Sequence, residues 1–76
     1  MREYLKDFRK RAGATQQNVA SELNITQQYY NQLELGKRKI SVPIICGLAK
    51  IFCTETQNIV EQENDYLSNQ QREEEK

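Results

Sequence analysis

Apolar residues recur at helical spacing along the chain, and short polar stretches with turn-forming residues separate them. Leu5 and Phe8 lie three positions apart and Ala12 follows four positions later, which indicates an amphipathic helix over residues 2–12. Gly13 comes after a basic last turn, as is typical where a helix ends. The chain therefore opens with a helix that buries one face.

Two more helices are predicted on either side of a sharp turn. Thr15 and Thr26 are suited to cap their N-termini. Asn24 and Gly36 tolerate the left-handed backbone at which helices often end. The third helix is thus expected over residues 27–35. The residues predicted to face inward from this pair are Val19, Ala20, Leu23, Tyr30 and Leu33.

The second half of the chain predicts a fourth and a fifth helix. Pro43 fits the first helical turn, because its missing N–H would have no partner there. Thr54 and Gln57 have the spacing of a capping box at the start of the fifth helix. The residues after Leu67 include no apolar side chain and are expected to fray. The residues predicted to face inward from the fourth helix are Val42, Ile45, Ala49 and Phe52, with Leu48 close beside them. One side of the fifth helix is expected to carry Ile59, Val60, Tyr66 and Leu67. The fold class is therefore all-α, a compact bundle of four to five short helices that contains a helix-turn-helix.

The charges are unevenly distributed along the 76 residues. Residues 1–60 hold nine Lys/Arg against five Asp/Glu, a net charge of +4, and residues 61–76 hold two against six, a net charge of −4. We expect one domain over residues 1–62, and a C-terminal extension of the fifth helix with an acidic, frayed tail over 63–76. The basic body favours a polyanionic partner, although a solvated surface with a solubilising tail fits the charges as well.

Several function classes find little support in the composition. There is no histidine and there are only two cysteines, so we expect neither a metal site nor any other cofactor. Cys46 is interpreted as a small core residue and Cys53 as a thiol at a loop edge. No glycine-rich phosphate loop or placed carboxylate pair suggests an enzyme. No apolar run approaches the roughly 20 residues of a membrane span, so we expect a cytoplasmic protein without a membrane partner.

The third predicted helix carries amides along its outer face. An amide can pair with N6 and N7 of adenine together, which the DNA major groove exposes. The next residues form a cationic loop that could contact phosphates. An ordinary solvated helix face is the alternative, and a stacking platform of Tyr29 and Tyr30 for single strands is disfavoured because adjacent helical residues point apart. The predicted base-contacting residues are Gln27, Gln28, Tyr29, Asn31 and Gln32, and the loop cations are Lys37, Arg38 and Lys39.

Residues 5–60 resemble the helix-turn-helix domain of the phage repressor and Cro family, the Xre-type regulators. The matching residues are Leu5, Phe8, Arg9, Thr15, Gln16, Gln17, Val19, Ala20, Leu23, Ile25, Thr26, Leu33, Glu34, Gly36, Lys37, Arg38, Leu48, Ala49 and Ile59. The chain departs from the family pattern at Ile40, usually Pro, at Pro43, commonly acidic, and at Cys53, commonly Gly or Asn. It also departs at Tyr29, usually small or polar, so Tyr29 and Asn31 are where operator choice could differ.

The resemblance implies roles for individual residues. Gln16 would contact DNA phosphate and brace the first recognition residue, and Gln17 would contact phosphate beside it. Gln27, Gln28 and Gln32 would reach base edges, as the amides of lambdoid repressors do on A·T-rich half-sites, while the loop cations would contact phosphate. Arg9 and Glu34 would form a buried ion pair between helices one and three.

The resemblance also predicts a function and partners. The chain is expected to be a sequence-specific regulator of transcription, a repressor that binds a double-stranded DNA operator. The alternative is an antitoxin, or a partner-controlled regulator, whose C-terminal helix binds another protein. A homodimer on a palindromic site is expected through Ile59, Tyr66 and Leu67, unless Ile59 and Val60 only close the core.

Overall fold

Five helices form the fold of this protein in a computed structural model that describes residues 1–74, with side chains through residue 69. The all-α fold class is confirmed, since residues 1–74 contain no strand. The helices are α1 (Glu3–Arg11), α2 (Gln16–Leu23), α3 (Gln27–Leu35), α4 (Val42–Ile51) and α5 (Thr56–Glu74).

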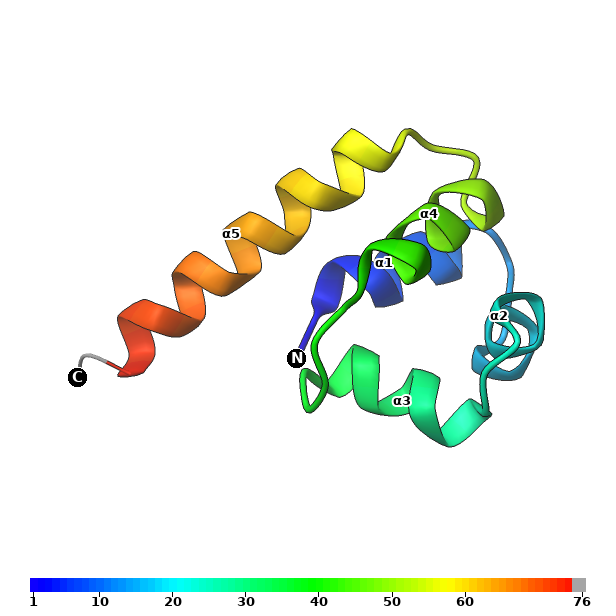
Figure 1. Cartoon of the computed structure of the whole chain (residues 1–76), viewed down its shortest axis with the longest axis horizontal. Coiled ribbons are helices and arrows are strands. Elements are labelled where there is room, and N and C mark those ends of the chain that lie inside the picture. Colours follow the sequence, from blue (N-terminus) through cyan, green and yellow to red (C-terminus); the bar gives the residue numbers. More distant parts are fainter. Residues whose placement is uncertain (75–76) are drawn as a thin grey trace.

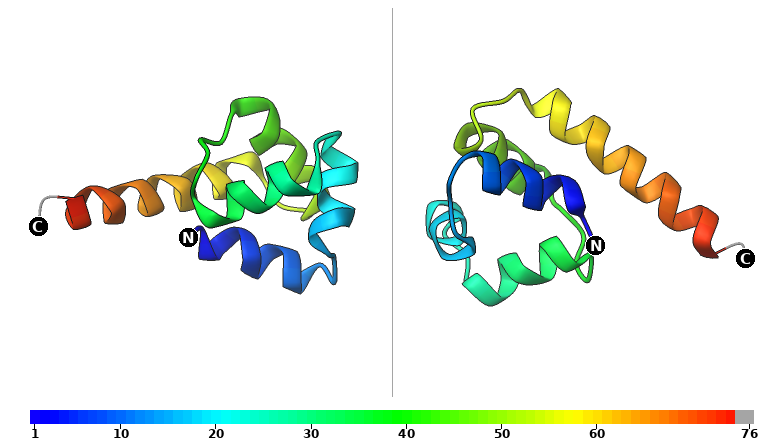
Figure 2. Two further views of the ribbon diagram at one scale, coloured as in Figure 1. Left: turned by 90° about the horizontal axis from the view of Figure 1, so that it is seen from below. Right: turned by 180° about the vertical axis from the view of Figure 1, so that it is seen from behind.

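The helices α2 and α3 form a corner at one end of the molecule, joined by a three-residue turn (Figure 1). α2 packs against both α3 and α4, α1 packs against α3, and α5 packs against α4. The last turns of α5 project beyond the other four helices in both views of Figure 2. The tertiary contacts therefore hold α3 at an edge, with one long face free.

Local capping explains where α2 and α3 begin. The Thr15 hydroxyl accepts a hydrogen bond from the Asn18 N–H, and the Asn18 side chain accepts one from the Thr15 N–H, both at 3.1 Å. The Thr26 hydroxyl accepts one from the Tyr29 N–H at 3.0 Å. Asn24 ends α2 in the left-handed conformation with φ of 59°. These side chains fix both helix starts and the turn between them, as the sequence predicts.

The core lies where the first four helices meet the first turns of α5. Two aromatic rings close one end of it, since Phe8 and Phe52 stack with centroids 5.5 Å apart. The core residues are Leu5, Val19, Ala20, Tyr30, Leu33, Leu48, Ala49 and Ile59, with Leu23, Ile45 and Phe52 packed against them. The predicted inward faces of α2 and α3 are confirmed.

Three predicted core positions are wrong. Val42 is 70% exposed, because it lies at the very start of α4 where no other helix covers it. Cys46 is also exposed, since α4 buries the face that carries Leu48 and Ala49 instead. Ala12 is exposed because α1 has already ended at Arg11.

The fifth helix starts differently from its prediction. No Thr54–Gln57 capping box forms; α5 starts at Thr56, and the Thr54 hydroxyl accepts from the Asn58 amide at 2.8 Å. α5 continues past Leu67 to Glu74, and the fraying of the tail stays a prediction. Adding residues to a formed helix requires no new nucleation, so polar residues can extend it. The division of the chain at residue 62 stays a prediction.

Gly36, at the end of α3, allows a close approach of α5. Its φ is +82°, and a side chain there would overlap the Tyr66 hydroxyl. Gly13 has a similar φ of +69° but open space around it.

We expect Gly13→Ala to lower the free energy of unfolding by about 1–2 kcal/mol, the cost of a left-handed alanine. Gly36→Ala should cost about 1–3 kcal/mol more, because it must also displace the Tyr66 ring. Urea unfolding of both variants measures the difference. Equal losses would show that the contact between Gly36 and Tyr66 contributes nothing to stability.

Candidate nucleic-acid interface

The free face of α3 carries the predicted base-contacting side chains. Gln27 and Gln28 are exposed, and neither side chain forms a hydrogen bond within the described part of the chain. Two shallow surface hollows meet at Gln28. One is lined by Gln16, Gln27, Gln28 and Asn31, and the other by Thr26, Gln28, Tyr29, Gln32 and Arg38. All five predicted base-contacting residues therefore lie on one continuous surface.

Tyr29 and Tyr30 point in different directions. Tyr30 is completely buried in the core, whereas Tyr29 is half-buried at the flank of α3. A stacking platform made of both rings is therefore excluded. Burial, and then the nearby negative charge of Glu34, raise the pKa of Tyr30 above its ordinary value, so the phenol stays neutral at pH 7.

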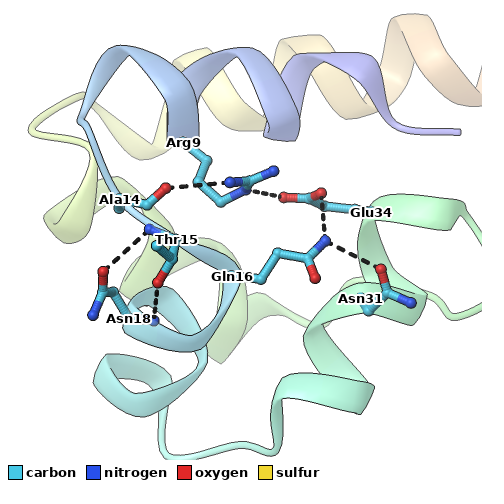
Figure 3. A network of polar contacts seen from close by, with 7 residues as sticks. All are labelled: Arg9, Ala14, Thr15, Gln16, Asn18, Asn31 and Glu34. Carbon is cyan, nitrogen blue, oxygen red and sulfur yellow. Dashed lines mark hydrogen bonds and ion pairs between the residues drawn. The ribbon is translucent and has the colours of Figure 1, made fainter.

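Gln16 braces a different residue from the one expected. Its amide nitrogen donates to Asn31 Oδ1 at 3.1 Å and to Glu34 Oε1 at 3.0 Å (Figure 3). No hydrogen bond joins it to Gln27, because Asn31 lies one helical turn further along α3 and reaches the amide first. Both N–H groups of Gln16 are thus already used, and a phosphate would have to displace one of these bonds. The backbone N–H groups of Gln16 and Gln17 remain as donors at this end, since that of Asn18 donates to the Thr15 hydroxyl.

The Arg9–Glu34 ion pair implied by the resemblance is present in the structure. Arg9 Nε donates to Glu34 Oε2 at 2.7 Å, and an Arg9 terminal nitrogen donates to the Ala14 carbonyl at 3.2 Å. Burial acts to raise the pKa of Glu34, but hydrogen bonds from Arg9 and Gln16 outweigh it and hold the pKa below its ordinary value. The carboxylate is therefore ionised at pH 7 and acts as a fixed acceptor at the junction of α1, α2 and α3.

The loop after α3 presents three exposed cations, Lys37, Arg38 and Lys39. Arg38 also lies over the Tyr29 ring, with its guanidinium carbon 4.9 Å from the ring centroid. Its Nε donates to Gln32 Oε1. The terminal nitrogens of Arg38 can still donate to a phosphate while Nε holds Gln32.

Sequence reasoning missed a second buried ion pair that positions this loop. Arg2 is 2% exposed, and its guanidinium binds both carboxylate oxygens of Glu63, at 2.8 and 3.0 Å. It also donates to the Leu33 carbonyl at 2.7 Å and to the Arg38 carbonyl at 2.8 Å. The Tyr4 hydroxyl completes the cluster by donating to Glu63 at 2.6 Å. Arg2 therefore ties α5 to the end of α3 and to the cationic loop.

One sequence signal could have revealed this cluster. Glu63 lies four residues after Ile59 and three before Tyr66, so it occupies the inward stripe of α5. A carboxylate in such a stripe requires a buried cation. The signal does not say which cation, because Arg2 is 61 residues away.

The predicted dimer residues divide between the inside and outside of the monomer. Ile59 is completely buried in the core, so its assignment to a dimer surface is wrong. The Tyr66 hydroxyl is buried against Gly36, and its ring lies under the Arg2 guanidinium at 4.9 Å. Both residues lie on the inward stripe of α5, so they pack against the rest of the monomer and are not available to a second copy. Leu67 is 44% exposed.

A comparison with protein families identifies the fold around this surface. A model described as "Helix-turn-helix" matches residues 5–54, about two thirds of the chain. The chain belongs to the Xre-type, lambda-repressor-like helix-turn-helix family. No curated protein and no solved structure gave a significant match to this helix-turn-helix chain.

Family membership makes the helix-turn-helix protein a DNA-binding regulator, in a family that is not typically enzymatic. The matched residues include α1 to α4 except the first two residues of α1, and therefore contain α2, α3 and the cationic loop. No helix within residues 1–74 has the length and hydropathy needed to cross a membrane.

Proposed function

We propose that this helix-turn-helix protein is a sequence-specific repressor that inserts α3 into the major groove of a double-stranded DNA operator. The observation that carries the proposal is the pair of exposed amides of Gln27 and Gln28, which have no hydrogen-bond partner within the described chain. A helix entering the groove reads bases with side chains near its N-terminus, where both amides lie. The bound protein would repress transcription by blocking access of polymerase to the operator.

Contacts to bases and to phosphates are assigned to different residues. The base-contacting set is Gln27, Gln28, Tyr29, Asn31 and Gln32. One side of this surface is flanked by the loop cations Lys37, Arg38 and Lys39. They would contact the DNA phosphate backbone, and such contacts fix the position of the protein on the duplex without reading its sequence. Gln16 and Gln17 flank the other side, where the first turn of α2 would offer its backbone N–H groups to a phosphate.

A palindromic site bound by a homodimer is the arrangement we propose, because one helix-turn-helix unit covers only a half-site. Of the predicted dimer residues, Leu67 remains exposed on α5. The same feature favours a second candidate, a partner-controlled regulator or antitoxin whose α5 binds another protein. Selection of bound duplexes from a random pool tests the first arrangement, since a symmetric footprint requires two copies and a single half-site requires one.

Single substitutions test the division between base and phosphate contacts. We expect Gln28→Ala to cost about 1–3 kcal/mol on the selected operator and to relax the preference at one base pair. Lys37→Ala should weaken binding to all duplexes alike and reduce the salt dependence of the affinity, because fewer counterions are released. Titration of operator and scrambled duplexes at two salt concentrations measures both effects. Uniform losses in both variants would contradict the assignment, and no salt-dependent binding to any duplex would contradict the proposed function.

A further inference from the structure

The Asn31 side chain is held in one orientation by a chain of three polar residues. Arg9 donates to Glu34 at 2.7 Å, Gln16 donates to the other carboxylate oxygen at 3.0 Å, and the same Gln16 nitrogen donates to Asn31 Oδ1 at 3.1 Å. Figure 3 shows these contacts linking α1, α2 and α3. Glu34 is 3% exposed, so water does not compete for the carboxylate.

The chemistry of these groups permits only one arrangement of the two amides. The ionised Glu34 carboxylate can only accept, so the Gln16 amide must turn its nitrogen toward it. The second N–H of that nitrogen then faces Asn31, whose oxygen must accept the hydrogen bond. The Asn31 nitrogen is consequently left on the side away from Gln16 (Figure 3), and it forms no hydrogen bond within the described residues.

The neighbouring amide is held with the same polarity. Gln32 accepts from Arg38 through its oxygen, and an arginine can only donate. Gln27 and Gln28 have no such contacts and can turn either way. The surface of α3 thus combines two adaptable amides near its start with two amides that present their N–H₂ groups.

We infer that Asn31 acts as a fixed hydrogen-bond donor that selects a base with only acceptors on its major-groove edge, guanine before thymine. Guanine offers N7 and O6, and thymine offers O4. Adenine needs the oxygen and the nitrogen of one amide to face the base together, and the bond from Gln16 holds the Asn31 oxygen toward α2 while the nitrogen faces away. Gln16 is then a positioning residue, which determines the base choice without touching a base. This inference rests on the proposed function and names one position of its operator.

Duplex selection with the full chain tests the inference. Asn31→Ala locates the base pair that Asn31 contacts: it is the operator position at which the variant selects bases less strictly than the unmodified protein. We expect guanine or thymine there for the unmodified protein, and a drop in affinity of about 5- to 150-fold when adenine replaces it. Adenine or cytosine at that position, or no position that relaxes, overturns the inference while the selected operator still supports the proposed function. Failure of the unmodified protein to enrich any duplex overturns both.

Two further variants and one control separate the orientation of the Asn31 amide from its contact with a base. Gln16→Ala frees the Asn31 amide to turn, so adenine at the located position should cost less than about threefold in affinity. Gln57→Ala is the matched control, because Gln57 is an exposed glutamine on α5 outside the proposed interface, and its side chain forms no hydrogen bond within the described residues; it should keep the original preference. Asn31→Asp retains the acceptor for Gln16 but replaces the outward donor with an acceptor, so the preference should move to cytosine, whose N4 donates. Unchanged discrimination against adenine in Gln16→Ala overturns the role given to Gln16.

Discussion

Replacement of Arg2 by methionine is expected to lower the free energy of unfolding by about 3–5 kcal/mol, the cost of leaving one member of a buried ion pair without its partner. Glu63 would keep only the hydrogen bond from Tyr4, and the Leu33 and Arg38 carbonyls would lose their shared donor. Methionine fills a similar volume, so the loss reports mainly on the missing charge and hydrogen bonds. Urea unfolding monitored by helical circular dichroism measures it.

Arg11→Met is the matched control for Arg2→Met. Arg11 is the last residue of α1, and Arg2 directly precedes that helix. Arg11 is exposed and has no hydrogen bond or ion pair among the described residues, so its loss should change stability by less than about 0.5 kcal/mol. The double variant Arg2→Met with Glu63→Met should regain part of the loss, because no buried carboxylate is then left unpaired. Equal effects of Arg2→Met and Arg11→Met would show that the cluster around Glu63 does not stabilise the fold.

Removal of the Glu34 carboxylate has the second large effect. Glu34→Ala should lower the free energy of unfolding by about 3–4 kcal/mol at pH 7, because Arg9 loses its charge partner and Gln16 loses an acceptor. The pKa of Glu34 is lowered in the folded protein, so its contribution is present above the unfolded value of about 4.3 and is lost as pH falls through the folded pKa. The stability difference between Glu34→Ala and the unmodified protein should therefore shrink on acidification.

Denaturant unfolding at a series of pH values from neutral to acid checks this prediction. Glu22→Ala supplies the control, since Glu22 is an exposed carboxylate on α2 without an ion pair in the described chain. Its effect should stay below about 0.5 kcal/mol across the series. A Glu34→Ala deficit that is independent of pH would mean that the carboxylate contributes through packing rather than through its charge.

The two buried ion pairs have different relations to DNA binding. Glu34 holds Gln16 and through it Asn31, so its loss should alter base preference as well as stability. Arg2 binds the carbonyls at the end of α3 and in the cationic loop, so its loss should affect the placement of phosphate contacts. The proposed interface is thus supported on both flanks by ion pairs that are largely buried.

The sequence by itself determined the features that depend on neighbouring residues. Thr15 and Thr26 cap helices within their own first turn, and Asn24 and Gly36 end helices through their own backbone conformation. The helical period placed Tyr30 and Leu33 inside, and it therefore left Gln27 and Gln28 outside. Such features follow from bonds and packing within a few residues, so a local pattern is sufficient to predict them.

Only the tertiary structure decided which distant groups meet. Arg2 finds Glu63 across 61 residues, and Gln16 reaches Asn31 because the turn between α2 and α3 brings them together. Burial of Ile59 and exposure of Val42 depended likewise on which helix covers each face. A helical period shows that a face is apolar or polar, but the partner of a buried charge and the direction of an amide depend on three-dimensional contacts that the period does not contain.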